Sequence, residues 1–396
     1  MKTFDLSAVQ QALRAADCAG WLFCDVFSRD PMAYRILGLD GSAKVSRRWF
    51  YYVPCEGEPV KLAHRVEPHR LDGLPGRQQH YLAWTELHEA LRRMLAGGGK
   101  VAMQYSALNQ VPTVAVVDAG TVELVRSCGV EVVSSADLVQ RFEAVTDEDG
   151  FRSHCETGDV VQRIKDEAFE LMNKAIHESG PITEHDVKEF VLARFREEGV
   201  TSDGASPIVG FNDHPADPHF EPTLDNAYHL HHGDTILLDL WARRANPPGI
   251  YYDITWCGFA GESPPALYRE IFGVVCRARD AALDFVRQRF TAGEPCRGWE
   301  VDQVARRVVE QAGHGREFLH RTGHSIGTEV HGRGANIDGL ETRDDRLLVP
   351  GTCFSLEPGI YLAGRMAVRT EIDVFLTLAG GVEVCGPIQD RLVLIG

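Results

Sequence analysis

The sequence predicts an α/β domain followed by a larger α+β domain, and three observations lead to this prediction. The chain has 396 residues, more than one hydrophobic core usually serves. Short apolar strands alternate with amphipathic helices in its first part. The remainder combines long helical patterns with strands that carry acidic residues at apolar positions. We place the domain boundary between residues 151 and 152.

Alternating elements in residues 1–151 predict a layer of parallel strands. The expected strands are Gly20–Val26, Trp49–Val53, Lys100–Met103 and Val130–Val133. The expected helices are Leu82–Leu95, part of Val111–Cys128, and Ser135–Glu143. The acidic stretch Val145–Gly150 ends in glycine, which predicts a hinge between the domains.

Residues 152–396 open with a helical pattern over Asp159–Glu178. Two later segments, Thr183–Gly199 and Trp299–Gly313, resemble each other in their Glu and Asp spacing and in the glycine that ends each one. Such an internal repeat predicts two half-domains that face each other across a cleft. The alternative is that two amphipathic helices are similar by chance.

Charge and composition disfavour nucleic acid and membranes as partners, and they disfavour secretion. A net charge of −16 would repel phosphate backbones and anionic lipids, so we expect neither nucleic acid nor membrane as a partner. Charged residues interrupt the N-terminal segment, which therefore does not resemble a secretory signal. The ten cysteines form no CxxC pair, which predicts reduced thiols and a cytoplasmic location.

Two aspartates lie in strands that are otherwise apolar. Asp239 interrupts the run DTILLDLWA, and Asp253 lies in IYYDITW. The segment between them, ARRANPPG, predicts a hairpin loop that would bring both carboxylates side by side. A buried carboxylate is costly unless it is paired or bound to a metal. A lone strand aspartate is usually a capping or ion-paired residue, but two on one hairpin favour a site.

Further candidate ligands follow in three motifs. Three histidines and several glycines occur in HRTGHSIGTEVHGRG, which begins at His320. Glu357 ends the apolar run FSLEPG, and Glu371 lies in AVRTEIDVFL two residues after Arg369. Carboxylates with one imidazole predict two hard or borderline divalent cations, Mn²⁺ or Co²⁺ in preference to a structural zinc.

The order of these motifs resembles the pita-bread metallopeptidases, which include prolidase, aminopeptidase P and methionine aminopeptidase. The resemblance covers roughly Asp159–Gly396, and Met1–Phe151 resembles more loosely the creatinase-type N-terminal domain of prolidase and aminopeptidase P. It implies a pita-bread catalytic domain and two divalent ions, Mn²⁺ first and Co²⁺ or Zn²⁺ as alternatives. The implied metal ligands are Asp239, Asp253, His324, Glu357 and Glu371.

The resemblance also implies roles in catalysis and substrate binding. Glu357 would carry the proton from the attacking water to the leaving amine, and His331 would contact the scissile carbonyl. His219, or alternatively His214, would face the substrate. His320 would lie beside the site, and the hydroxyl of Thr255 would support the metal cluster. The sequence departs from the family pattern at Leu240–Trp241, Trp256 and Gly332, but it retains all five ligands.

The activity implied is hydrolysis of Xaa-Pro dipeptides by a homodimer, with aminopeptidase P activity on longer peptides as the alternative. A non-catalytic binding module and a metal-free creatinase-type hydrolase both predict missing ligands. Specificity for dipeptides needs a cation for the substrate's carboxylate, and Arg is suited to it. Arg343 lies fourteen positions before Glu357, as in prolidases; Arg333 and Arg369 are its rivals.

Overall fold

A computed structural model describes residues 4–178 and 180–396, and the chain divides into two compact units, Met1–Glu143 and Ala144–Gly396. The boundary expected after residue 151 and the hinge expected at Val145–Gly150 fall instead on the start of helix α6 (Glu148–His177). Asp147 caps this helix by accepting a hydrogen bond from the backbone N–H of Gly150. The acidic stretch therefore suits the positive end of a helix, and it begins just after the division between the two units, so the hinge stays a prediction.

The first unit contains a six-stranded sheet in the order β4-β3-β2-β1-β5-β6. The strands are β1 (Gly20–Asp25), β2 (Trp49–Pro54), β3 (Val60–His64), β4 (Arg77–Tyr81), β5 (Lys100–Met103) and β6 (Glu131–Ser134). The expected all-parallel layer is wrong, because β2 runs antiparallel to both β1 and β3. The sequence prediction also omitted β3 and β4; β4 is a polar edge strand that lacks the apolar signal.

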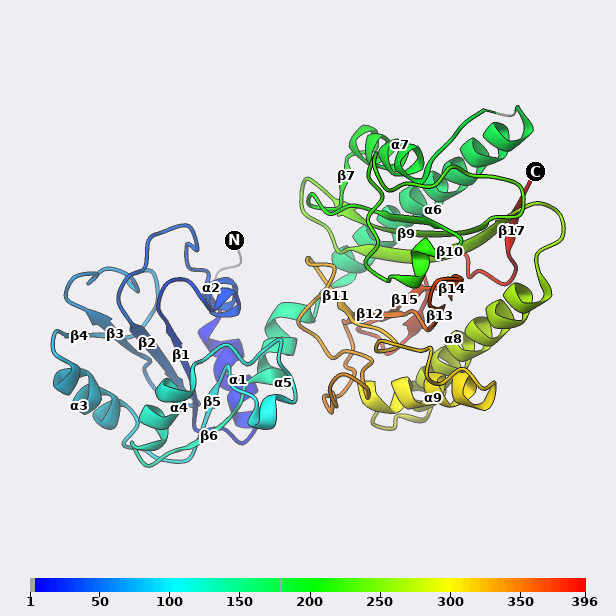
Figure 1. Cartoon of the computed structure of the whole chain (residues 1–396). Helices are drawn as coiled ribbons and strands as arrows, with labels where there is room; N and C mark the ends of the chain where they lie inside the picture. The colour runs from blue at the N-terminus through cyan, green and yellow to red at the C-terminus, as the bar shows by residue number, and fades with distance from the viewer. Residues whose placement is uncertain (1–3, 179) are drawn as a thin grey trace. The chain divides into compact units, whose positions relative to one another are not determined.

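Apolar residues cover both faces of this sheet. Trp21 and Phe23 belong to one buried cluster and Leu22 to another, as expected from the alternation of side chains along a strand. The helices are α1 (Leu6–Ala15), α2 (Pro31–Leu37), α3 (Trp84–Met94), α4 (Ala119–Arg126) and α5 (Ala136–Val139), with short helical turns at Ala107–Asn109 and Gln140–Ala144. The unit is therefore an α/β domain (Figure 1).

In the part of the second unit that the structure describes, there are two sheets, a two-stranded ribbon and four helices. The first sheet contains β7 (Val200–Thr201), β8 (Ile208–Phe211), β9 (Thr235–Arg244), β10 (Tyr252–Ala260) and β17 (Val393–Ile395). The second contains β11 (Ser325–Ile326), β12 (Cys353–Leu356), β15 (Ile372–Leu376) and β16 (Val382–Glu383), and the ribbon consists of β13 (Gly359–Leu362) and β14 (Met366–Arg369). A short 3₁₀ turn spans His214–Ala216.

Each half of this unit pairs one long helix with a shorter one. Helices α6 and α7 (Glu184–Glu197) form an apolar cluster with β9 and β10. Helices α8 (Ala266–Ala292) and α9 (Gly298–Gln311) form another with β12 and β15. The strands lie between the two helix pairs (Figure 1). Helix α8 is absent from the sequence prediction, although its buried residues recur at helical spacing.

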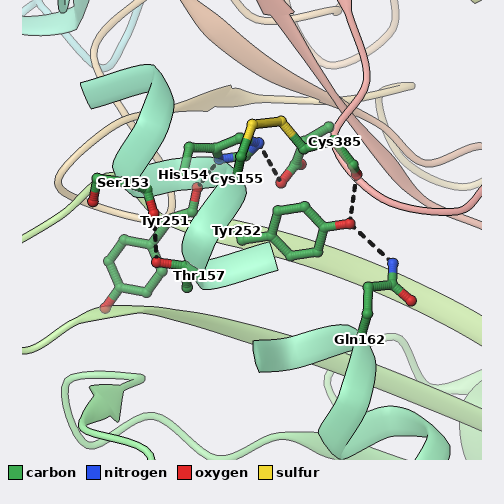
Figure 2. Close-up of a disulfide and its surroundings, with 9 residues drawn as sticks. Ser153, His154, Cys155, Thr157, Gln162, Tyr251, Tyr252 and Cys385 are labelled. Carbon is green, nitrogen blue, oxygen red and sulfur yellow. Dashed lines mark hydrogen bonds and ion pairs between the residues drawn. A yellow bond between two sulfur atoms is a disulfide. The ribbon is translucent and has the colours of Figure 1, made fainter. Parts of the chain in front are cut away.

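A disulfide joins Cys155 in α6 to Cys385, with 5.3 Å between their Cα atoms (Figure 2). The expectation that all ten cysteines are thiols is therefore wrong for this pair, which lies 230 residues apart and follows no recognisable spacing. Beside the bond, the hydroxyl of Tyr252 donates to the carbonyl of Cys385 and accepts from Gln162. Among the described residues, no helix is long and apolar enough to cross a membrane.

Candidate metal centre

The hairpin of β9 and β10 places two carboxylates on one face. Asp239 is opposite Thr255, and Asp253 is opposite Trp241, so the two aspartates are diagonal neighbours. Since side chains alternate along a strand, Asp239, Asp253 and Thr255 point to the same side of the sheet. Both carboxylates are buried, with 7% and 4% of their surface exposed.

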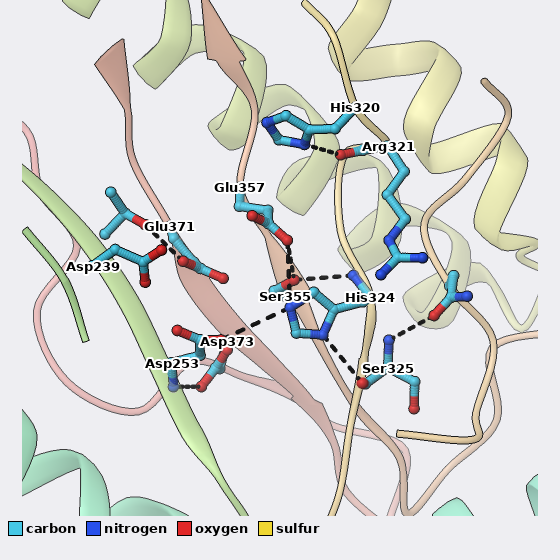
Figure 3. A network of polar contacts seen from close by, with 12 residues as sticks. Asp239, Asp253, His320, Arg321, His324, Ser325, Ser355, Glu357, Glu371 and Asp373 are labelled. Carbon is cyan, nitrogen blue, oxygen red and sulfur yellow. Dashed lines mark hydrogen bonds and ion pairs between the residues drawn. The ribbon is translucent and has the colours of Figure 1, made fainter. Parts of the chain in front are cut away.

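The second sheet brings two glutamates to the same place. Leu356 in β12 pairs with Ile372 in β15, which makes Glu357 and Glu371 the next pair beyond the strand ends. Backbone contacts join the two sheets there: the N–H of Glu371 donates to the carbonyl of Thr255 over 3.1 Å. The N–H of Asp253 donates to Oδ2 of Asp373 over 2.7 Å. The four carboxylates therefore gather around one point (Figure 3).

His324, just before β11, contributes the imidazole. Its Nδ1 lies 3.2 Å from the carbonyl oxygen of Ser325, so this nitrogen carries the proton. Its Nε2 lies 3.4 Å from Oε1 of Glu357 and 3.8 Å from Oδ2 of Asp253. Burial and the positive charge of Arg321 lower the pKa of His324 to about 3. The imidazole is therefore neutral at physiological pH, with the Nε2 lone pair facing the carboxylates.

The donor set fits a divalent metal. Ligand atoms of Asp253, His324 and Glu371 all lie within 4.8 Å of one another. Oδ1 of Asp253 and Oε1 of Glu371 are buried without a hydrogen-bond partner in the described part of the chain. Burial and the neighbouring carboxylates raise the pKa values of Asp253 and Glu371 well above their usual range. Divalent cations would supply the positive charge that compensates these buried carboxylate oxygens.

Arg369 braces the same cluster from β14. Its guanidinium donates to Oδ2 of Asp239, to Oγ1 of Thr255 over 2.9 Å and to the hydroxyl of Tyr361 over 3.1 Å. The hydroxyl of Thr255 in turn donates to Oε2 of Glu371 over 2.8 Å. Thr255 thus has the supporting contact expected of it. Tyr361 was not predicted, although it lies in the same GIYL run that follows Glu357.

A cavity of about 670 Å³ opens over these side chains. All five candidate ligands line it, together with His219, His320, Arg321, His331 and Arg369. The alternative candidate His214 is not among the lining residues: its Nδ1 lies 2.8 Å from Oε2 of the buried Glu184, and its ring stacks on Tyr228. The structure therefore favours His219 over His214 as the histidine that faces a substrate.

His320 and His331 differ in the contacts that their imidazole rings make. Nδ1 of His320 lies 2.6 Å from the carbonyl oxygen of Arg321, and its Nε2 lies 2.8 Å from the hydroxyl of Tyr361. Both nitrogens of His320 are therefore engaged. The ring of His331 packs edge-on against His324 at 4.4 Å. The proximity of His324, followed by burial, lowers the pKa of His331 to about 4, so its imidazole is neutral and has one N–H that can donate.

Comparison with known proteins agrees with this geometry. The family model described as metallopeptidase family M24 matches residues 159–378. The chain belongs to family M24. This confirms the pita-bread metallopeptidase resemblance and, with it, the predicted fold of an α/β domain followed by a pita-bread domain.

Two curated relatives and one solved structure show how far this M24 protein resembles others. It is 32% identical over 261 residues to "Probable dipeptidase PepE" of Mycobacterium tuberculosis, which is 66% of this chain but only 64% of the relative's length. It is 32% identical over 216 residues, 54% of each chain, to "Xaa-Pro dipeptidase" of Lactobacillus delbrueckii subsp. lactis. The crystal structure of dipeptidase PepE from Mycobacterium ulcerans covers 100% of both chains at 25% identity and a TM-score of 0.71.

The structure does not place Arg343 in the cavity lining, although the sequence predicted that Arg343 binds the substrate's carboxylate. Its guanidinium lies over the ring of Trp299, 4.6 Å from the centroid, and it is not among the residues that line the cavity. The rival Arg333 also lies outside that lining, with Nη2 3.3 Å from Oε2 of Glu329. The arginines that line the cavity are Arg321 and Arg369, and Arg321 was not a sequence candidate.

Proposed function

We propose that this M24 protein hydrolyses the Xaa-Pro bond of dipeptides with the help of two divalent cations, Mn²⁺ in the first place. The observation that carries the proposal is the cluster of four carboxylates and one neutral imidazole that lines a single cavity. The names of relatives, dipeptidase PepE and Xaa-Pro dipeptidase, support the choice of substrate. The expected homodimer and cytoplasmic location stay predictions.

The proposed ligands are Asp239, Asp253, His324, Glu357 and Glu371. Bound there, the cations would lower the pKa of a water molecule and polarise the scissile carbonyl. Glu357 is suited to move the proton, because its Oε1 faces the cavity at 3.4 Å from His324 and accepts only from Ser355 Oγ, at 3.1 Å, in the described part of the chain. His331 would donate a hydrogen bond to the carbonyl oxygen as negative charge develops on it.

A substrate panel tests the proposal. With Mn²⁺ added, purified enzyme should cleave Xaa-Pro dipeptides with a kcat/KM about ten- to a hundredfold above that for Xaa-Pro-Yaa tripeptides, because one charge-assisted contact to the dipeptide's carboxylate is worth that much. Xaa-Ala dipeptides serve as the control for proline. If the enzyme cleaves tripeptides equally well, the proposed dipeptidase activity is wrong and aminopeptidase P activity takes its place. No cleavage of any Xaa-Pro peptide would reject both.

His331→Ala should retain its metal and lose stabilisation of the transition state. Removal of one preorganised donor costs about 3 kcal/mol, or roughly a hundredfold in kcat. Elemental analysis of the variant gives its metal content, and steady-state kinetics give kcat. A variant that loses metal in proportion to activity would show that His331 is a ligand.

A further inference from the structure

Arg321 holds a fixed position in the wall of the cavity. Its backbone N–H donates to Oε1 of Glu341 over 3.0 Å, and its carbonyl oxygen lies 2.6 Å from Nδ1 of His320. Arg321 lines the same cavity as His324 and His331. Figure 3 shows that Arg321 and His324 come from the same loop, with the Arg321 side chain drawn beside the backbone of His324. The backbone is therefore anchored on both sides of a side chain that faces the substrate space.

The guanidinium of Arg321 differs from that of Arg369, the other arginine in the cavity lining, because it has no partner. Across residues 4–178 and 180–396, no hydrogen bond or ion pair reaches it. Arg369, by contrast, is held by three side chains, and Arg346 forms a buried ion pair with Asp344. Arg321 is thus the cavity-lining arginine whose guanidinium is not already held by the described part of the chain. Its five N–H groups remain available to an anionic ligand.

A dipeptide supplies such a ligand, since its free carboxylate follows directly on the residue after the scissile bond. We propose that Arg321 is the specificity-determining residue that binds this carboxylate; the inference rests on the proposed function. The planar guanidinium can hold a carboxylate through two parallel hydrogen bonds. Arg369 already donates to Asp239, Thr255 and Tyr361, so Arg321 is the cavity-lining arginine that remains for the substrate's carboxylate.

The test compares Xaa-Pro with Xaa-Pro-amide, which lacks the negative charge. In Arg321→Gln, kcat/KM for the acid should fall about ten- to a hundredfold, chiefly through KM, while the amide changes less than about threefold. Arg321→Lys keeps the charge without the planar fork and should recover part of the loss. The ratio of acid to amide is taken within one preparation, so that any difference in metal content near His324 cancels.

Two further variants give the comparison its controls. Arg316→Gln removes an exposed arginine outside the cavity and should leave the ratio unchanged. Arg343→Gln tests the rival predicted from sequence: a collapse of the ratio there, and not in Arg321→Gln, would overturn the inference. An equal loss of acid and amide turnover in Arg321→Gln would also overturn it. In either case the wild type still cleaves Xaa-Pro, whereas failure of the proposed function would leave the wild type itself inactive.

Discussion

Glu357→Gln should lower kcat for Xaa-Pro dipeptides by at least two to four orders of magnitude. The amide has the shape of the carboxylate and can still accept from Ser355, but it cannot take a proton from water and pass it to the leaving amine. General acid–base transfer alone contributes about 10²–10⁴-fold. Loss of one negative charge from the ligand set should weaken metal binding and add to the effect. Stopped assays with excess Mn²⁺ measure the remaining turnover.

The matched control is Glu383→Gln, which makes the same chemical change at an exposed position in β16 of the same sheet. It should have wild-type turnover and the same Tm. Circular dichroism and thermal unfolding should show both variants folded, because Glu357 lies at the end of β12 and its backbone N–H still donates to the carbonyl of Thr322. If Glu357→Gln cleaves dipeptides at a near wild-type rate, another group moves the proton.

The two aspartate ligand candidates were predictable because each one violates the apolar pattern of its own strand. Asp239 and Asp253 lie among apolar strand residues, where an unpaired charge is costly, so the sequence itself indicates that something must compensate. Strand pairing explains why residues far apart in sequence meet: the hairpin sets Asp239 against Thr255, and the β12–β15 register sets Glu357 against Glu371. The local sequence pattern therefore indicated candidate ligands, and the tertiary fold brings their side chains together.

The orientation of surface and loop side chains was not predictable in this way. Offset along the chain favoured Arg343, but its side chain packs over Trp299, a contact set by where α9 begins. Arg321 follows His320 in the motif, and no sequence pattern indicated that it binds substrate. The disulfide between Cys155 and Cys385 likewise joins segments that only the fold brings together. These features depend on packing across the unit, which composition and periodicity do not encode.

Removal of metal with a chelator should abolish Xaa-Pro hydrolysis, and Mn²⁺ or Co²⁺ should restore it. The physical reason is the charge of the site: without cations, Asp239, Asp253, Glu357 and Glu371 face one another, and among the described residues Arg369 is the positively charged side chain that pairs with them. Cations at a hundred times their dissociation constant would stabilise the fold by about 2.7 kcal/mol. This corresponds to roughly 5–10 °C in the Tm of a unit of this size.

The same charges give the metal-free protein a characteristic dependence on pH. Burial raises the pKa of Asp239 to about 6, against the opposing charge of Arg369, and raises those of Asp253 and Glu371 well above their usual range. The folded apo form therefore binds more protons than the unfolded chain, so its stability is highest below about pH 4 for these groups and falls as the pH rises through 6.

Bound cations remove this penalty, because the ligands must be deprotonated to bind them. The difference in Tm between the Mn²⁺-loaded and the chelated protein should therefore grow between pH 5 and pH 8. Differential scanning fluorimetry at fixed ionic strength measures it, with activity recorded on the same samples. Full activity in a preparation shown to be metal-free by elemental analysis would exclude a metal-dependent mechanism. A Tm difference that is independent of pH would instead show that the carboxylates are already ionised in the apo fold.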